Sequence, residues 1–166
     1  MRLQAVALTL LVSGCSAAPA ARSATTGGEY TPNATVVRVV DGDTIVARID
    51  GVEEKVRLIG IDTPETKKED SPVECFGPEA SAFTAGLLPP GTAVHLERDV
   101  EARDRYGRLL AYVYLADGTF VNLTIAREGY ASVLTIAPNV THADQFVAAA
   151  RAAEAADAGL WGGCSQ

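Results

Sequence analysis

Acidic side chains gather at the ends of apolar, strand-like runs between residues 39 and 65. Asp41, Asp43, Asp62 and Glu65 are the acidic residues at these ends. Two strand ends that meet bring carboxylate oxygens together around one hard cation such as Ca²⁺. Thiolate and imidazole ligands are absent from the stretch, which argues against zinc. Read singly, each motif is more typical of a structural role, with Asp-Gly as a turn and Thr-Pro-Glu as a helix entry.

Arg57 is a cation inside the same stretch. A guanidinium holds a phosphate through two parallel hydrogen bonds, and Glu65 is a possible general base close by. The alternative for Arg57 is a buried ion pair with Glu65. Asp41 is expected to cap its turn rather than bind the ion.

The elements that must position these residues follow from residue periodicity and turn signals. Alternating or apolar runs bounded by turn residues predict strands, and apolar spacing of three to four predicts helices. The predicted strands cover residues 35–41, 44–49, 54–61, 92–98 and 108–115. The predicted helices run from Pro78 to the Pro89 stop, from Asn122 to about Glu128, and from a Thr141 cap to Gly159.

The motifs resemble, in order and spacing, those of the thermonuclease family of staphylococcal nuclease-like domains. They are Asp41-Gly42-Asp43-Thr44, Arg57, Ile61-Asp62-Thr63-Pro64-Glu65-Thr66 and Asp104-Arg105-Tyr106-Gly107-Arg108-Leu109-Leu110-Ala111-Tyr112. The similarity runs from about Thr35 to Trp161. It implies an α+β fold dominated by a five-stranded, antiparallel-type β-barrel, the OB-fold, with three helices.

The resemblance also implies roles for the charged residues. Asp43, Asp62 and the backbone carbonyl of Thr63 would hold Ca²⁺, with water completing the shell. Glu65 would assist the attack of water on phosphorus. Arg57 and Arg108 would grip the phosphate and stabilise the charge that develops on its oxygens.

Other positions of the resemblance concern substrate binding and structure. Arg105 and Tyr106 are the expected substrate-binding residues of the loop before Gly107. Glu97 and His142 are expected to pair between the barrel and the last helix, and Asn122 to bond loop backbone. Where well-known members carry two tyrosines beside the nucleotide, the sequence is interpreted as having Thr135 and Ala137. Loss of aromatic stacking, worth about 1–3 kcal/mol per base, would lower nucleotide affinity.

The composition sets limits on these expectations. The chain has 166 residues and a net charge of −7. One domain is the default for this length. Proteins that bind nucleic acid tightly and without sequence preference are usually basic, so the cations must act locally, together with any bound metal.

The N-terminal segment has the features of an export signal. Arg2 precedes an apolar run over residues 3–12 that is too short to cross a bilayer. Residues 11–15 resemble a bacterial lipobox, which predicts lipidation at Cys15; the alternative is a plain secretory signal cleaved near residues 18–21. The chain divides into a signal (1–14), a flexible tether (15–33), the nuclease-like domain (34–162) and a short tail (163–166).

Cys75 and Cys164 remain as a pair once Cys15 is assigned to the signal. Disulfides persist in exported proteins, so we expect these cysteines to be bridged, with two free thiols as the alternative.

The leading hypothesis is an exported, monomeric, Ca²⁺-dependent nuclease that hydrolyses DNA and RNA, leaves 3′-phosphate ends and has no protein partner. It would act at the membrane through the lipid anchor, or as a secreted protein. The alternatives are a catalytically weak OB-fold module that binds nucleic acid and a lipoprotein with a structural role in the envelope. Only the nuclease needs Asp43, Asp62, Glu65, Arg57 and Arg108 together.

Overall fold

The computed structural model describes residues 30–66 and 73–164. The signal, Cys15 and most of the tether lie outside these residues. Within them, no helix is both long and apolar enough to cross a membrane. Residues 30–33, which the sequence assigns to the tether, contact the barrel. Asn33 donates to the Leu96 carbonyl and accepts from the Leu96 amide, and Tyr30 stacks on Tyr114 with ring centroids 4.2 Å apart.

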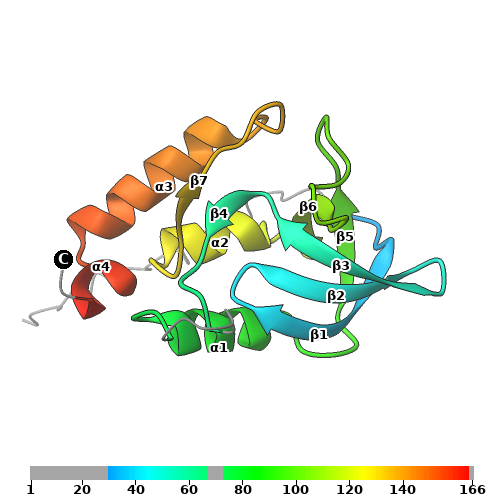
Figure 1. The fold of residues 1–166 in the computed structure, drawn as a ribbon, viewed down its shortest axis with the longest axis horizontal. Coiled ribbons are helices and arrows are strands. Elements are labelled where there is room, and N and C mark those ends of the chain that lie inside the picture. Colours follow the sequence, from blue (N-terminus) through cyan, green and yellow to red (C-terminus); the bar gives the residue numbers. More distant parts are fainter. Residues whose placement is uncertain (1–29, 67–72, 165–166) are drawn as a thin grey trace, which may run out of the picture.

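Five strands close into a barrel in the order β1-β2-β3-β6-β5 (Figure 1). Their bounds are β1 (Ala34–Asp41), β2 (Thr44–Ile49), β3 (Val52–Leu58), β5 (Ala93–Glu97) and β6 (Leu109–Leu115). The pairs are antiparallel except β3 with β6, which run parallel. The barrel is therefore mixed rather than wholly antiparallel, because β6 reaches β3 only after a crossover through α1 and β5.

The predicted strand over residues 54–61 is two strands. A break at Ile59 and Gly60 separates β3 from β4 (Gly60–Asp62), and Gly60 has a φ of 89°. β4 leaves the barrel and pairs antiparallel with β7 (Ser132–Leu134), a strand that the sequence did not predict. This change of direction carries Asp62 away from the barrel wall.

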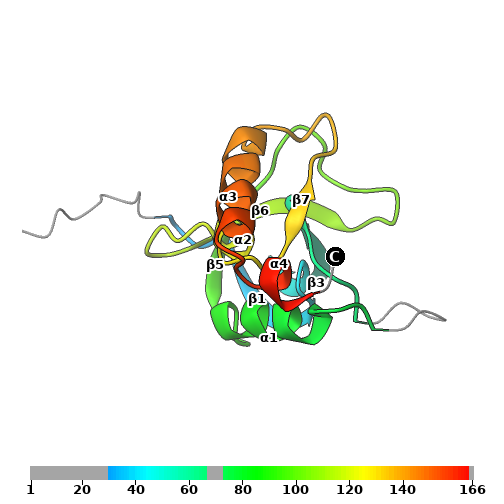
Figure 2. The ribbon, with the colours of Figure 1, turned by 90° about the vertical axis from the view of Figure 1, so that its left-hand side faces the viewer.

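Residues 30–66 and 73–164 form four helices, one more than predicted. They are α1 (Gly77–Leu87), α2 (Val121–Arg127), α3 (Ala143–Ala155) and α4 (Leu160–Gly163). Figure 1 shows α1 below β1 and α3 at the upper left, with α2 between the two helices, and Figure 2 shows α4 beside the end of α3. The added helix α4 is a single turn.

The start of α3 differs from the prediction. His142, not Thr141, occupies the N-cap position and makes no side-chain cap. Thr141 instead donates from its amide and its hydroxyl to the two carboxylate oxygens of Asp99, at 3.0 and 2.9 Å. Asp99 also accepts from the Tyr112 hydroxyl at 2.9 Å. The start of α3 is therefore tied to the barrel rather than capped by its own hydroxyl.

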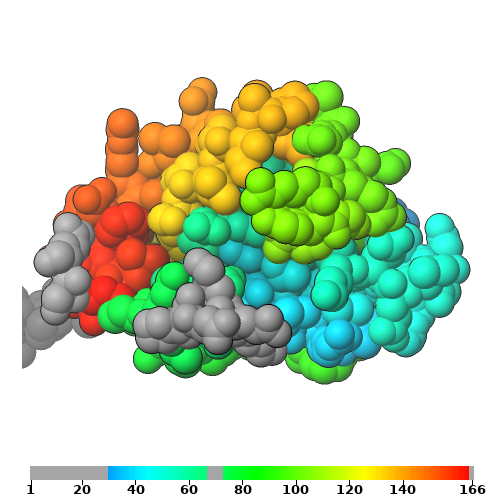
Figure 3. Space-filling view, in the orientation of Figure 1, coloured from blue at the N-terminus to red at the C-terminus, as the bar shows by residue number. Residues whose placement is uncertain are grey.

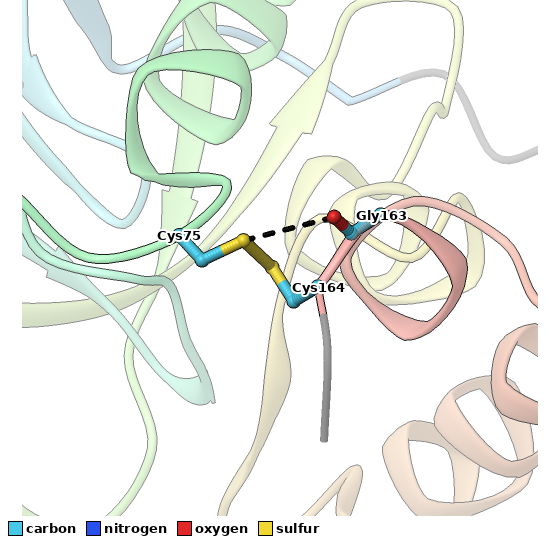
Figure 4. The surroundings of a disulfide bond; sticks show 3 residues. All are labelled: Cys75, Gly163 and Cys164. Atoms are coloured by element: carbon cyan, nitrogen blue, oxygen red, sulfur yellow. Dashed lines mark hydrogen bonds between the residues drawn. A yellow bond between two sulfur atoms is a disulfide. The ribbon is translucent and has the colours of Figure 1, made fainter.

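The core fills the barrel and continues beneath α2 and α3. Ile45, Leu58, Tyr112, Ile125 and Phe146 are among its largest fully buried side chains. A disulfide joins Cys75, just before α1, to Cys164, just after α4, with Cα atoms 6.0 Å apart (Figure 4).

Candidate active site

A cavity of about 780 Å³ opens between the barrel and the loops that flank it. Seven of the predicted site residues line it: Asp43, Arg57, Asp62, Glu65, Arg105, Tyr106 and Arg108. In Figure 3 the loop of residues 99–108 (light green) lies over the cyan barrel strands, next to the yellow and orange segment of residues 130–140. The structure thus brings together side chains that the sequence spreads over more than 60 positions.

Arg57 joins the two carboxylates that the sequence proposed as metal ligands. Its Nη2 atom lies 3.0 Å from Asp43 Oδ2 and 2.8 Å from Asp62 Oδ1. Asp43 is buried, whereas half of the Asp62 side chain is exposed. Asp43 Oδ2 also accepts from the amide of Thr63 at 3.0 Å, which places Thr63 beside the same carboxylate. The two strand ends therefore converge, with one guanidinium nitrogen between their acids.

The expected alternative ion pair between Arg57 and Glu65 is wrong. The other terminal nitrogen of Arg57, Nη1, donates to the carbonyls of Leu58 and Ile61, both at 2.7 Å. Those carbonyls flank the break between β3 and β4, and they leave Arg57 turned toward Asp43 and Asp62. Glu65 lies on the cavity wall, where a carboxylate can accept a proton from water.

Negative charge is concentrated at this end of the cavity. Asp41 accepts from the Asp43 amide at 3.3 Å, the turn-capping contact that the sequence predicts. Burial, together with the charges of Asp43 and Glu65, raises the pKa of Asp41 to about 6. Burial also raises the pKa of Asp62, helped by Asp43 and Glu74 and opposed by Arg57. Charges of like sign raise carboxylate pKa values in this way when no cation offsets them.

The donor set fits a hard divalent cation. It consists of carboxylate oxygens from Asp43 and Asp62 with the carbonyl of the adjacent Thr63, which are ligands that Ca²⁺ prefers. In residues 30–66 and 73–164 no group of three or more His, Cys, Asp or Glu side chains is gathered for a metal, so water must supply much of the shell.

The loop before β6 carries the remaining cations. Asp104 accepts from the backbone amides of Tyr106 and Arg108, both at 2.9 Å, and from Arg108 Nε at 2.7 Å. The Arg105 and Arg108 guanidinium carbons lie 4.7 and 5.5 Å from the centre of the Tyr106 ring. Tyr106 is 68% exposed, so this ring is an open surface over which a base could stack. Asp104, which the sequence analysis gave no role, orients Arg108.

Thr135 and Ala137, which are interpreted as standing where well-known family members carry two tyrosines, do not line the cavity. The cavity is lined instead by Leu134 and Ile136, because alternate residues of an extended segment face the same side. Ile136 is 62% exposed. The site therefore has two aliphatic side chains at this wall.

Asn139 is a buried cavity residue that sequence reasoning missed. Its side chain donates to the Glu101 carbonyl at 3.0 Å and accepts from the Glu101 amide at 2.7 Å. It thereby joins the segment that carries Ile136 to the loop that carries Arg105. A buried amide side chain was not distinguishable by sequence from an ordinary turn residue after Pro138.

Two further residues occupy structural positions. His142 Nε2 lies 3.7 Å from Glu97 Oε1, the contact expected from the resemblance. Asn122 accepts from the Val113 amide and donates to the carbonyls of Ile59 and Ala111, and so bonds strand backbone and the β3–β4 break. Neither lines the cavity.

The structure combines a closed five-stranded barrel of the OB-fold type with a cavity lined by acidic residues and arginines. A family model described as "Staphylococcal nuclease homologue" matches residues 55–163. Among the relatives of this chain, a protein named "Thermonuclease" from Staphylococcus hyicus is 42% identical over 126 residues, which cover 76% of this chain and 73% of the relative. The "Thermonuclease" of Staphylococcus intermedius is 44% identical over 126 residues, covering 76% and 74%.

A third relative, named "Endonuclease YncB", from Bacillus subtilis (strain 168), is 45% identical over 116 residues, which cover 69% of this chain and 54% of the relative. The chain belongs to the staphylococcal nuclease homologue family. It is therefore a member of a family of hydrolytic nucleases, which are phosphodiesterases.

Proposed function

We propose that the protein is a Ca²⁺-dependent nuclease that hydrolyses phosphodiester bonds of DNA and RNA and leaves 3′-phosphate ends. The observation that carries the proposal is the convergence of Asp43, Asp62, Glu65, Arg57 and Arg108 on one cavity. Family membership and the names of the relatives support a nuclease. The ion and the product ends are inferred from the donor set and the resemblance.

Each side chain of the cavity has a distinct task in this proposal. Ca²⁺, held by Asp43, Asp62 and the Thr63 carbonyl, would supply positive charge next to the phosphate. Glu65 accepts the proton of the attacking water, which forms the new bond to phosphorus. The bond from phosphorus to the 5′ oxygen breaks, the 5′ oxygen takes a proton from water to become a hydroxyl, and the phosphate stays on the 3′ oxygen. Arg108 donates to phosphoryl oxygens as their negative charge grows.

Arg57 changes partners in this proposal. Its Nη2 atom occupies the space between the Asp43 and Asp62 oxygens, which are the oxygens that would face a cation. Ca²⁺ would be held by those carboxylates and would supply positive charge there, and Arg57 would offer guanidinium donors to the phosphate. The two donors to the Leu58 and Ile61 carbonyls keep the side chain in place.

Export and anchoring are also proposed. The apolar segment and the lipobox-like residues before Cys15 support export followed by lipidation, with plain secretion as the alternative. The disulfide between Cys75 and Cys164 is consistent with an oxidising compartment.

The test of the catalytic assignment is Glu65→Gln, with Glu154→Gln on the exposed face of α3 as the matched control. Loss of a general base lowers the rate by about 10²–10⁴-fold, because general-base catalysis contributes that much. Ca²⁺ binding, measured by calorimetry, should change little, since Glu65 is not one of the proposed ligands. The rate on single-stranded DNA is measured with both ligands saturating, and thermal unfolding of the same samples shows that the variant is folded.

A Glu65→Gln rate within threefold of the wild type would remove Glu65 as the base. Wild-type protein that binds single-stranded DNA but does not cleave it with Ca²⁺ would support the nucleic-acid-binding module instead.

A further inference from the structure

The backbone of Glu65 is held from both sides by Glu74. The Glu65 amide donates to Glu74 Oε2 at 3.0 Å, and the Glu74 amide donates to the Glu65 carbonyl at 3.0 Å. Glu65 lies beyond the end of β4, so the regular hydrogen bonds of a strand do not fix its position. The two bonds to Glu74 take over that function.

Glu74 is in turn fixed by its chain neighbours. Cys75 follows it directly and is joined covalently to Cys164 at the end of α4. The Gly77 amide donates to the Glu74 carbonyl at 3.1 Å. Gly77 packs so closely on this turn that an added Cβ would lie 3.0 Å from the Glu65 carbonyl oxygen. The start of α1 and residue 65 therefore form one compact unit.

The other end of the disulfide is fixed to the body of the protein. The Leu160 amide, at the start of α4, donates to the Gly129 carbonyl at 2.9 Å. A Cβ on Gly163 would lie 3.0 Å from the Phe76 ring, and Phe76 packs against Tyr130 with ring centroids 5.4 Å apart. Figure 4 shows the bridge beside Gly163, whose carbonyl oxygen is 3.8 Å from Cys75 Sγ. The bridge thus links the residue after Glu74 to a segment that is bonded to Gly129 and packed against Phe76.

We propose that Glu74 is a positioning residue for Glu65 and that the Cys75–Cys164 disulfide holds Glu74 in place. The proposal rests on the proposed function, in which Glu65 is the base. A base displaced by about 1 Å from the attacking water loses up to 10²-fold in rate, although the substrate and the metal still bind. Glu74 and the disulfide that holds it are called the clamp below. Loss of the clamp should therefore lower kcat and leave KM and the Ca²⁺ affinity nearly unchanged.

The first experiment compares Glu74→Ala and Glu74→Gln with Glu154→Ala. Alanine removes the acceptor of the Glu65 amide, whereas the Gln carbonyl oxygen keeps it. Glu74→Ala should lower kcat by about 10-fold to 100-fold with KM and the Ca²⁺ midpoint within twofold of wild type. Glu74→Gln and Glu154→Ala should stay within threefold. In a Glu65→Gln background, Glu74→Ala should cause no further loss, because the group that it positions is already gone.

The second experiment removes the bridge by the double substitution Cys75→Ser and Cys164→Ser. The same bridge is opened in wild type by a dithiol, which is oxidised to its own disulfide as the two cysteine thiols form. Both treatments should lower kcat as Glu74→Ala does, at a temperature where circular dichroism shows folded protein. Hydrogen exchange of the Glu65 amide should become at least about 10-fold faster in Glu74→Ala, in the double cysteine variant and in the dithiol-treated wild type.

Unchanged exchange at the Glu65 amide would overturn the clamp whether or not the protein cleaves DNA. Faster exchange with an unchanged kcat in a cleaving enzyme would overturn the positioning role. So would a Glu74→Ala change that lowers kcat in the Glu65→Gln background as much as it does in wild type. A wild type without Ca²⁺-dependent cleavage, or a fully active Glu65→Gln, rejects the proposed catalysis and with it the positioning role, while the exchange result still decides the clamp.

Discussion

Asp43 and Asp62 both contact the Nη2 atom of Arg57. Arg57 lies next to the end of β3, where the chain leaves the barrel. Arg57 is buried, and its four partners are two carboxylates and two backbone carbonyls. Removing one member of a buried ion pair is costly, since it leaves the other charged group unpaired. Arg57 is therefore a structural residue as well as a candidate phosphate ligand, and substitutions at it mix the two effects.

Asp41 gives a pH-dependent prediction at the scale of one residue. Its pKa is raised from 3.8 to about 6, so the folded protein holds a proton that the unfolded chain releases near pH 4. Stability from this group is complete below pH 4 and is lost as the pH rises through 6. Asp41→Asn should therefore be more stable than wild type by about 1–2 kcal/mol at pH 7, after allowance for partial exposure, and by much less at pH 4.

Urea unfolding at pH 4 and pH 7, without divalent cations, measures that difference, and Asp144→Asn on α3 is the control. An equal difference between Asp41→Asn and wild type at the two pH values would show that the Asp41 carboxylate is not destabilised by its neighbours.

At the scale of elements, the break between β3 and β4 directs Asp62 into the cavity. Gly60 has a φ of 89°, and an added Cβ would collide with the ring of Phe146 on α3. Gly60→Ala should lower the free energy of unfolding by about 2–4 kcal/mol, because it adds backbone strain to overpacking. Gly86→Ala is the matched control, since Gly86 lies in α1 with open space around its Cα and should gain up to about 1 kcal/mol.

Chemical unfolding of both variants measures these changes. A Gly60→Ala protein as stable as wild type would mean that the chain passes from β3 to β4 without this close approach.

The same elements show which parts of the fold could be predicted. The barrel strands were predictable because apolar alternation and Asp-Gly turns are local signals, whereas their closure into a barrel was expected only from the family resemblance. The break at Gly60 depends on Phe146, which is distant in the sequence, so continuous apolar residues concealed it. The Thr141 cap failed for a similar reason, because Asp99 captures that hydroxyl across the fold.

The residues that form the site could be predicted from the sequence, but the contacts between them could not. Its acidic residues and arginines are in conspicuous motifs, and the cavity contains them. Ion-pair partners depend on which way a side chain leaves its strand, and for this reason the structural alternative for Arg57 named Glu65 rather than Asp43 and Asp62. Which side of the extended segment faces the cavity was also not predictable, and Leu134 and Ile136 line it while Thr135 and Ala137 do not.

At the scale of the whole molecule, an acidic protein must bind a polyanion through a few cations. The net charge is −7, while Arg57, Arg105 and Arg108 line the cavity. Three phosphate contacts on single-stranded DNA give a slope of about −2 for log K against log salt concentration. We expect this shallow dependence for the Glu65→Gln protein with saturating Ca²⁺, measured by fluorescence anisotropy. A slope steeper than about −5 would place the main contacts on a basic surface outside the cavity.

Cleavage of single-stranded DNA by the purified wild-type protein, with Ca²⁺ or with a chelator, tests the central claim most directly. With Ca²⁺ we expect products that carry a 3′-phosphate and a free 5′-hydroxyl, identified by mass spectrometry. The chelator should abolish cleavage, added Ca²⁺ should restore it, and Asp62→Asn should need more Ca²⁺ than Asp144→Asn. Cleavage that continues at the same rate in chelator, or no cleavage with Ca²⁺ by folded protein, would contradict the account.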